Sequence, residues 1–292
     1  LRSLTGQDDL THALRDLQQS RLAPQTRAMH LAIEKVTGTG VTFSTFRAVE
    51  NAMSVDRNLT PQGAMAELGR LERRGDIIAL DSTQGAAGDY VSRANWQNEL
   101  TILRHIAEGK NSVTPLMPGA SDQLQTEMAG LTAGQKQAGG LILESPDRFI
   151  PIQGYAGVGK TTQFSVVAKA LQQLDSPPQV VGVAPTHRAV SELQSAGIDA
   201  QTIASFLGEQ ERYQARGETP DFSNTVFVID ENSMNGNAQM AALVDIVARG
   251  NGRAVLSGDK DQLKSLESGA PFALILERSA ADVAVMQEIV RQ

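Results

Sequence analysis

The sequence predicts an α/β protein in which a parallel sheet, covered by helices on both faces, follows a small helical domain. The length of 292 residues suits two domains, and 41% hydrophobic residues are enough for packed cores. From residue 121 onward, short apolar runs alternate with helical segments, as is typical of a parallel sheet. Before that point, apolar residues recur mainly at helical spacing.

The N-terminal region reads as helices and one hairpin. Thr60 is a helix N-cap followed by Pro61 at the first helical position, and Gly75 ends this helix. A Gly/Ala-rich turn separates the two extended segments that follow it. Helices followed by a hairpin resemble a winged-helix module. The predicted elements are helices within 10–17, 29–36, 60–75 and 95–108, and extended segments at 77–80 and 89–92.

A polar stretch from 109 to 122, with two prolines, is predicted to be a linker. We therefore expect an N-terminal domain with its linker at 1–120 and a second domain at 121–292. Four apolar runs in the second domain are predicted to be parallel strands, although Pro151 weakens the first of them. These runs are Phe149–Ile152, Val180–Ala184, Thr225–Ile229 and Arg253–Ser257.

Composition and charge exclude several classes of protein. With 26 Lys and Arg against 33 Asp and Glu, the net charge is −7, so nucleic acid would need a local groove. The lack of cysteine excludes disulfide scaffolds, zinc fingers and thiol catalysis, and it fits a cytoplasmic location. No apolar run reaches the roughly 20 residues of a membrane span, so we expect no membrane insertion. The chain starts at Leu1 without a methionine or signal peptide, which suggests a piece of a longer protein.

A glycine-rich segment between a predicted strand and a predicted helix fits the phosphate-loop pattern. Its glycines allow a tight loop whose amides face phosphate oxygens. Lys160 would place a cation on the β- and γ-phosphates, and the Thr161 hydroxyl would coordinate Mg²⁺. A chance glycine-rich turn is the alternative. The predicted nucleotide-binding residues of the loop are Gly154, Tyr155, Ala156, Gly157, Val158, Gly159, Lys160, Thr161 and Thr162.

An acidic pair, Asp230 and Glu231, follows the apolar strand 225–229 and would lie at its carboxyl end. Asp230 would hold Mg²⁺, mostly through water, and Glu231 would polarise the attacking water. A helix N-cap is the alternative explanation of the pair. Together with the phosphate loop, the acidic pair predicts a nucleoside triphosphatase.

Further segments occur in a fixed order around these two motifs. Together they resemble motifs Q, I, Ia, Ic, II, III and the start of motif IV of superfamily 1 helicases. The variants are similar to the 5′→3′ branch (1B, RecD-like), and the resemblance extends over essentially the whole chain to the active helicase region of F-type conjugative relaxase–helicases, the TraI/TrwC family. The segments are Leu131–Ala138, Gln153–Thr162, Ala184–Ala189, Gln201–Leu207, Asp230–Glu231, Gly258–Leu263 and Glu288–Gln292.

The resemblance implies a RecA-like motor lobe that uses ATP and Mg²⁺. It implies that Gln135 recognises the adenine edge, that Gln262 senses the γ-phosphate and that Arg291 neutralises the transferred phosphoryl group. A helix start with hydroxyls and an arginine can bind a phosphate backbone in a local groove. The residues that the resemblance assigns to the single-strand track are Pro185, Thr186, His187, Arg188 and Thr202.

Simpler explanations stay open for three of these residues. Gln135 could be a helix-surface amide, His187 a packing residue and Arg291 a solvated charge. The chain also departs from the family at Asn232, where Ser or Ala is usual, and we expect this to alter the contact between motifs II and III. Because Asp230 is retained along with its glutamate, we still expect competence for hydrolysis.

Together, the motifs and the resemblance predict an ATP-dependent 5′→3′ DNA helicase or translocase region of a conjugative relaxase that unwinds plasmid DNA for transfer. The implied partners are single-stranded DNA, the relaxosome and the type IV secretion coupling protein. Such helicases close ATP between two RecA-like lobes, so we expect this chain alone not to unwind duplex. Two alternatives stay open: a RecD-like helicase of repair or recombination, and a non-catalytic docking module of the secretion machinery.

Overall fold

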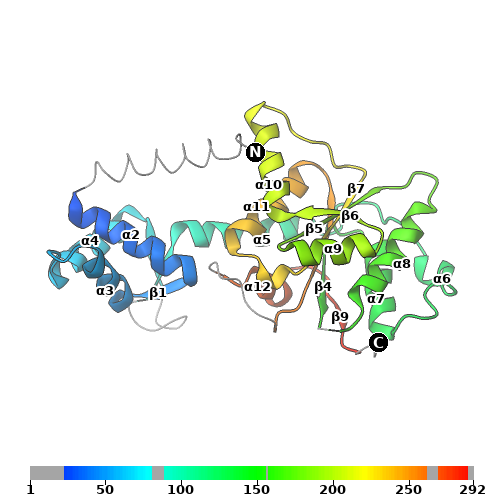
Figure 1. Cartoon of the computed structure of the whole chain (residues 1–292), viewed down its shortest axis with the longest axis horizontal. Helices are drawn as coiled ribbons and strands as arrows, with labels where there is room; N and C mark the ends of the chain where they lie inside the picture. The colour runs from blue at the N-terminus through cyan, green and yellow to red at the C-terminus, as the bar shows by residue number, and fades with distance from the viewer. Residues whose placement is uncertain (1–22, 81–88, 156, 262–268, 289–292) are drawn as a thin grey trace. The chain divides into compact units, whose positions relative to one another are not determined.

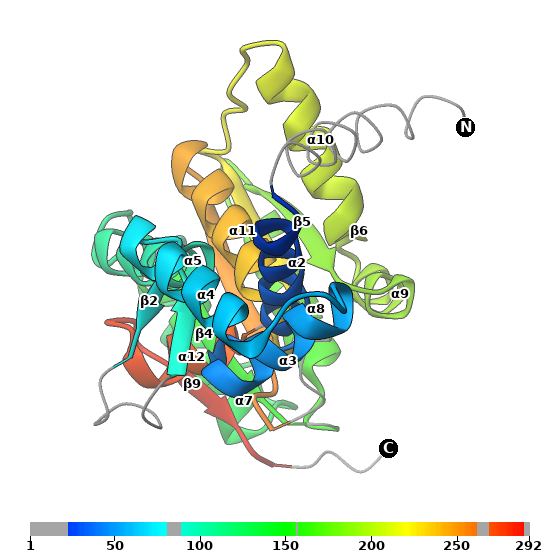
Figure 2. The same ribbon diagram turned by 90° about the vertical axis from the view of Figure 1, so that its left-hand side faces the viewer.

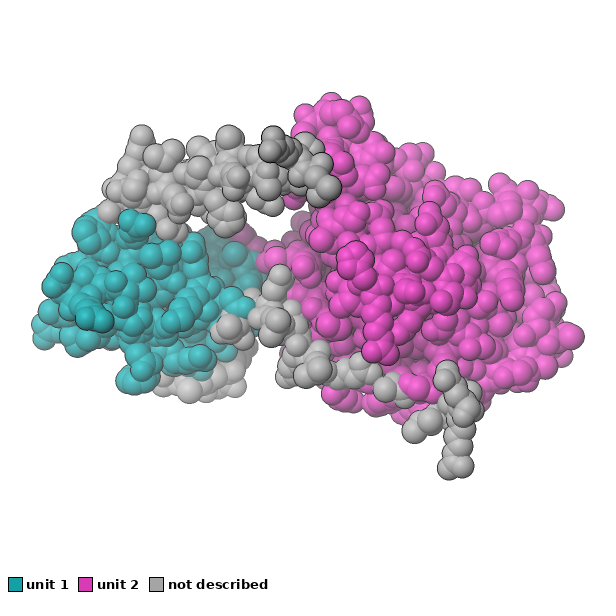
Figure 3. All heavy atoms as spheres, viewed as in Figure 1, with its two compact units in different colours: residues 1–96 teal, residues 97–292 magenta. Residues whose placement is uncertain are grey.

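A computed structural model describes residues 23–80, 89–155, 157–261 and 269–288 of the chain. The chain divides into two compact units, residues 1–96 and residues 97–292, which Figure 3 colours separately. The first unit holds a three-stranded antiparallel sheet, and the second holds a six-stranded parallel sheet. The predicted α/β class is therefore confirmed.

The first unit has the element order of a winged helix, with its strands in the order β1-β3-β2. Helix α4 begins and ends as predicted. Thr60 Oγ1 accepts a hydrogen bond from Gly63 N at 3.1 Å, and Gly75 adopts a left-handed φ of 73°. The elements are α2 (Pro24–Thr39), β1 (Thr42–Ser44), α3 (Thr45–Val55), α4 (Pro61–Arg74), β2 (Ile77–Ala79) and β3 (Asp89–Ser92), as labelled in Figure 1.

Two elements of this unit, β1 and α3, were not among the predicted ones. Strand β1 has three residues, too few for a periodic signal, and α3 follows it directly. Ser44 caps α3 by accepting a hydrogen bond from Arg47 N at 3.3 Å, and Phe43 and Ala48 are buried in the core of this unit. The helix predicted within 10–17 lies outside the described residues.

The second unit is built on a parallel sheet of order β6-β5-β7-β8-β4-β9. Its strands are β4 (Phe149–Gly154), β5 (Gln179–Ala184), β6 (Asp199–Thr202), β7 (Thr225–Ile229), β8 (Arg253–Gly258) and β9 (Ala284–Met286). Its helical elements are α5 (Arg93–Glu108), which starts in the first unit, α6 (Ala120–Gln123), α7 (Ala133–Glu144), α8 (Lys160–Gln172), α9 (His187–Ser195), α10 (Ile203–Ala215), the short turn η1 (Asn232–Met234), α11 (Asn237–Arg249) and α12 (Pro271–Arg278).

The central strands are buried on both faces. In β7, Val226 and Val228 belong to one core, whereas Phe227 and Ile229 belong to the other. Helices α7, α8 and α9 complete the first core, and α5, α10, α11 and α12 complete the second (Figures 1 and 2). This double burial explains why the strands are unbroken apolar runs in the sequence. None of the described helices is long and apolar enough to cross a bilayer.

Strand β4 tolerates Pro151 because the two strands that flank β4 pair with it over different lengths. Strand β8 pairs with β4 along Phe149–Gln153, but β9 pairs only with Ile152–Gly154. Pro151 therefore lies where β4 has no partner on the β9 side, and its missing N–H is tolerated there. Strands β6 and β9 were not predicted, because β6 is mostly polar and β9 has only three residues.

The segment 109–122, predicted as a linker, packs on the second unit. Val113 N donates to Pro146 O at 3.0 Å, and Met117 N donates to Leu143 O at 2.8 Å. Leu116 and Met117 also contact the first core. Its prolines and polar residues therefore belong to an ordered strap rather than to a free connection.

The division between the compact units falls inside α5, between Trp96 and Gln97, whereas the sequence suggested a boundary after residue 120. Ile102 and Ile106 of α5 are buried in the core of the second unit. The helix therefore contributes its apolar face to the parallel sheet, which moves the boundary toward the N-terminus.

A buried arginine fastens the strap to the sheet. Arg253 is 5% exposed, and its guanidinium donates to Thr114 O and, at 3.4 Å, to Ser145 O. Burial, helped by the nearby charge of Arg148 and opposed by Asp147, lowers the pKa of Arg253 to about 10. The guanidinium is thus still charged at neutral pH.

Replacing Arg253 with alanine should lower the free energy of unfolding by roughly 2–4 kcal/mol, because two buried carbonyl groups lose their donors. Arg249→Ala is the matched control, since this arginine is half exposed and its pair with Asp245 should contribute about 0.5 kcal/mol or less. Urea unfolding of both variants measures the difference. Equal losses would mean that the buried bonds do not hold the strap.

Candidate nucleotide and single-strand sites

The phosphate loop lies between β4, which ends at Gly154, and α8, which begins at Lys160. Gly157 and Gly159 have left-handed φ values of 74° and 70°. A Cβ on Gly154 would lie 3.0 Å from side-chain atoms of Lys160 and Met286. The glycine pattern is therefore required by backbone geometry and by close approach. No side chain caps α8, whose N-terminal amides suit an anion.

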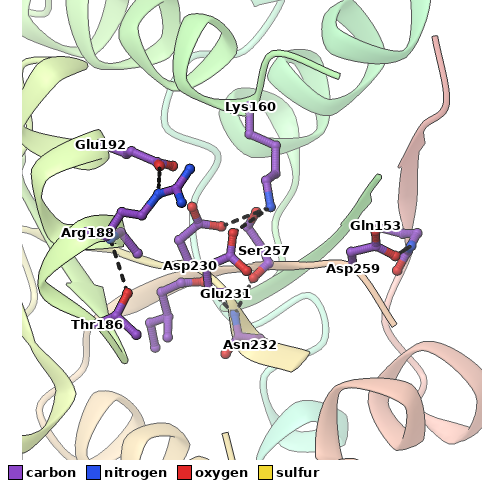
Figure 4. A network of polar contacts seen from close by, with 12 residues as sticks. Gln153, Lys160, Thr186, Arg188, Glu192, Asp230, Glu231, Asn232, Ser257 and Asp259 are labelled. Atoms are coloured by element: carbon purple, nitrogen blue, oxygen red, sulfur yellow. Dashed lines mark hydrogen bonds and ion pairs between the residues drawn. The ribbon is translucent and has the colours of Figure 1, made fainter. Parts of the chain in front are cut away.

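Lys160 lies against the acidic pair at the carboxyl end of β7 (Figure 4). Its Nζ is 3.4 Å from Glu231 Oε1 and 3.7 Å from Asp230 Oδ1. Burial lowers the pKa of Lys160, but the carboxylates of Asp230, Glu231 and Asp259 raise it by more, so the pKa lies above its ordinary value. Lys160 is therefore held in its charged form beside the two acids.

The acidic pair and the loop offer ligands that suit a magnesium ion. Asp230 is 5% exposed, and its Oδ1 accepts no hydrogen bond within the described part of the chain. Thr161 is the second residue of α8 and lines the same cleft as Glu231. A carboxylate and a hydroxyl are hard oxygen ligands of the kind that Mg²⁺ prefers. Asp230 and Thr161 therefore fit the predicted metal, with Mg²⁺ completing the charge balance of a triphosphate.

Glu231 has an unusual backbone. Its φ and ψ are 53° and 39°, in the left-handed region, and it precedes the short turn η1. For a residue with a Cβ this conformation costs roughly 1–2 kcal/mol. Such strain persists where neighbouring contacts impose it, and it is frequent at functional sites.

The start of motif III is tied to the strand that precedes the phosphate loop. Gln153 Nε2 donates to Asp259 Oδ1 at 3.0 Å, and Lys260 N donates to Gln153 Oε1 at 3.1 Å. Gln153 and Asp259 are both buried. Gln153 begins the phosphate-loop motif of the sequence, but no role was predicted for its side chain. Gln262 of motif III, together with Ala156 and Arg291, lies outside the described residues.

Gln135 is not a surface amide, because it is 2% exposed. Its Nε2 donates to the phosphate-loop carbonyls of Val158 at 2.8 Å and Gly159 at 3.1 Å. Its Oε1 accepts from Thr132 N at 2.9 Å, which completes a capping box at the start of α7. The side chain thus braces the phosphate loop, and the adenine contact that the resemblance implies stays a prediction.

The residues assigned to the single-strand track lie at the ends of two neighbouring strands. Thr186 caps α9 by accepting from Ala189 N at 3.2 Å, and Thr202 caps α10 by accepting from Ser205 N at 3.2 Å. Ala184 of β5 pairs in register with Thr202 of β6. The two capped helix starts therefore lie at the same edge of the sheet.

The side chains after Thr186 are available to a ligand. His187 is exposed, so it is not a packing residue, and Pro185 is half-buried. The Arg188 side chain is 90% exposed, and its Nε donates to Glu192 Oε1 at 3.1 Å (Figure 4). Within the described residues, the Arg188 side chain thus pairs with an exposed glutamate one helical turn away.

One cleft of about 910 Å³ unites the phosphate loop with the start of α9. Thr186, Arg188 and Glu192 line it together with the phosphate loop, Glu231 and Met234. Thr202 does not line this cleft. Arg188, which the motif assigned to the single-strand track, therefore lines the same cleft as the phosphate loop, whereas Thr202 lies outside this cleft.

Comparison with known proteins agrees with this architecture. A model of the AAA domain family matches residues 130–292. The multifunctional conjugation protein TraI of Escherichia coli (strain K12) is 46% identical over 296 residues, which cover 100% of this chain and 17% of TraI. The RecBCD enzyme subunit RecD of Mycolicibacterium smegmatis is 31% identical over 151 residues, which cover 43% of this chain and 27% of RecD.

Among solved structures, the arterivirus nonstructural protein 10 helicase in complex with DNA aligns with a TM-score of 0.31 and 16% identity, over 53% of this chain and 37% of that chain. This chain spans 17% of the length of TraI. The similarity to RecD supports the 1B branch of superfamily 1. The resemblance seen in the sequence is confirmed: the chain belongs to the AAA domain family, and its whole length corresponds to a segment of the TraI conjugation proteins.

Proposed function

We propose that this chain is the first motor lobe of an ATP-dependent 5′→3′ DNA helicase within a conjugative relaxase. The observation that supports this most directly is the approach of Lys160 Nζ to Glu231 at 3.4 Å and Asp230 at 3.7 Å, at the end of a glycine-shaped phosphate loop. The similarity to a segment of TraI over the whole of this chain supports the conjugative setting. In that setting the protein unwinds plasmid DNA in the cytoplasm, with the relaxosome and the type IV secretion coupling protein as partners.

Bound with Mg²⁺, ATP supplies the phosphoryl group that is transferred to water. Lys160 exchanges its two carboxylate partners for phosphate oxygens, and this releases the Glu231 carboxylate. Glu231 then orients a water molecule and accepts its proton. Asp230 and Thr161 hold the metal, and the amides at the start of α8 bind phosphate oxygens.

The remaining site residues link ATP hydrolysis to the bound single-stranded DNA. Gln262 senses the γ-phosphate, and Arg291 neutralises the charge of the transferred group. Single-stranded DNA follows the helix starts capped by Thr186 and Thr202, and Arg188 supplies a cation. A second motor lobe closes the nucleotide cleft and makes unwinding possible.

A RecD-like helicase of repair or recombination is the second candidate, favoured by the similarity to RecD over 43% of this chain. A His-rich, metal-dependent nicking domain upstream in the full-length protein would support conjugation over repair. A non-catalytic docking module is a third possibility, and ATP turnover that depends on Lys160 would exclude it.

The hydrolysis assignment predicts different outcomes for two variants of the full-length protein. Glu231→Gln should keep Mg·ATP binding, because Asp230 and Thr161 still hold the metal, and should lose turnover. Lys160→Ala should lose turnover because the transferred charge is no longer stabilised. Phosphate release stimulated by single-stranded DNA is measured together with circular dichroism. Near-normal turnover in either folded variant would refute the assigned role of that residue.

Gln135→Ala should raise the ATP dissociation constant roughly tenfold to a hundredfold and leave GTP binding unchanged, if the side chain reads adenine. The bonds to Val158 and Gly159 give a contrasting outcome: loss of the brace would weaken ATP and GTP equally. Gln137→Ala, an exposed glutamine two residues further along α7, is the control. An equal loss of affinity for ATP and GTP would show that Gln135 has a structural role and does not read the base.

Arg188→Ala should weaken single-strand binding and make its salt slope shallower by about one unit. Arg212→Ala on α10, also exposed, should leave both quantities unchanged. A salt titration followed by fluorescence anisotropy measures the slope, and ATP affinity is measured without DNA. An unaltered salt slope combined with weaker ATP binding would show that Arg188 contacts the nucleotide and not the single-stranded DNA.

A further inference from the structure

Asn232 is a fully buried amide between the ends of β7 and β8. Its Nδ2 donates to the carbonyl of Ile229 and, at 2.9 Å, to the carbonyl of Ser257 (Figure 4). Its Oδ1 accepts from Asn235 Nδ2 at 3.1 Å. A Cβ on Gly258 would lie 3.0 Å from Asn232 N, so the two strand ends approach closely here. This one side chain therefore joins two strand ends that carry motifs II and III.

The residue next to this amide is the strained Glu231. Ile229 lies two positions before Glu231 and Asn232 directly after it, so the bonds of Asn232 fix the chain on both sides of the glutamate. Met234 N donates to Glu231 O at 3.0 Å, which closes the short turn. A left-handed backbone is kept only where surrounding contacts determine it. In this chain the bonds of Asn232 flank Glu231, whose Oε1 accepts from Lys160 Nζ at 3.4 Å.

The bonds of Asn232 continue to the phosphate loop through β8. Ser257 is bonded to Asn232, and two residues later Asp259 accepts from Gln153 at the end of β4. Gln153 directly precedes the phosphate loop. Two buried side-chain amides thus tie together the ends of β7, β8 and β4, the three adjacent strands that form the nucleotide site.

We propose that Asn232 is a positioning residue that holds the Glu231 carboxylate in its working orientation and thereby sets the rate of hydrolysis. This inference rests on the proposed function. Asn232 touches neither nucleotide nor metal, because it is fully buried beneath the site. Its loss therefore lowers kcat and leaves the affinity for Mg·ATP unchanged.

An amide matches the two carbonyl groups that meet at this point of the chain. The two carbonyls of Ile229 and Ser257 require two N–H donors, and a primary amide provides both. A serine has a single O–H donor and satisfies one of them. An alanine satisfies neither and leaves both carbonyls without this donor.

The test compares Asn232→Ala, Asn232→Ser and the control Asn237→Ala in the full-length protein. Asn237 is an equally buried amide that bonds Glu99 instead of the Glu231 turn. Asn232→Ala should lower kcat about tenfold with the Mg·ATP dissociation constant within about twofold, and Asn232→Ser should recover about half of that loss on a logarithmic scale. Asn237→Ala should change the melting temperature and leave kcat unchanged. In a Glu231→Gln background, Asn232→Ala should cause no further loss.

Parent kcat in the folded alanine variant, a parallel loss of affinity, or an equal kcat loss in Asn237→Ala would each overturn the proposal. If Asn232→Ala does not fold, the serine variant decides, because parent kcat there overturns the proposal and a reduced kcat with unchanged affinity supports it. Absence of ATP turnover in the parent protein overturns the proposed function itself, whereas turnover that survives Glu231→Gln removes Glu231 as the base and with it the role proposed for Asn232. Turnover lost in Glu231→Gln but kept in Asn232→Ala overturns only the role of Asn232.

Discussion

The pairing of Lys160 with Asp230 and Glu231 is the interaction on which the site depends. A lysine at the end of a closed glycine loop loses hydration, which by itself favours the neutral amine. Two carboxylates within 4 Å reverse that preference and keep the ammonium charged. The ammonium of Lys160 offsets the charge of one of the two carboxylates. In the proposed function, a phosphate that binds Lys160 competes with these carboxylates, so phosphate binding and the release of the Glu231 carboxylate are coupled.

This pairing constrains the sheet. The lysine follows β4 and the acids follow β7, but β8 lies between these strands. The parallel register brings all three carboxyl ends to one edge, where no backbone ladder joins β4 to β7 directly. Gln153 and Asn232 bridge the gap, each bonding to the end of β8. The apolar cores on both faces fix the strands, and these buried amides fix their ends.

The sequence predicted the parts of the fold whose signals are local. The central strands are apolar on both faces, and the cap at Thr60 and the glycine at 75 delimit α4, so these elements were predicted correctly. The ordered strap at 109–122 was missed, because its contacts with Arg253 join residues more than a hundred positions apart. Roles for Lys160, Asp230 and Glu231 were predicted from motif chemistry. The sequence also pointed to Asn232 at the contact between motifs II and III, but its bonds to Ile229 and Ser257 form only where two strand ends meet.

Gln135 stands between these cases, because its capping-box partner Thr132 is visible in the sequence three residues earlier, but its bonds to Val158 and Gly159 are not. For Arg188 the sequence motif and the structure point to different ligands. The motif predicts a contact with single-stranded DNA, whereas the side chain lines the nucleotide cleft together with Glu192. A chain with a net negative charge can bind both a nucleotide and single-stranded DNA only if positively charged side chains lie locally at the two sites. The start of α9 lines the cleft and lies at the sheet edge where Thr202 caps α10, so in the proposed function the nucleotide and the single-stranded DNA meet at this helix start.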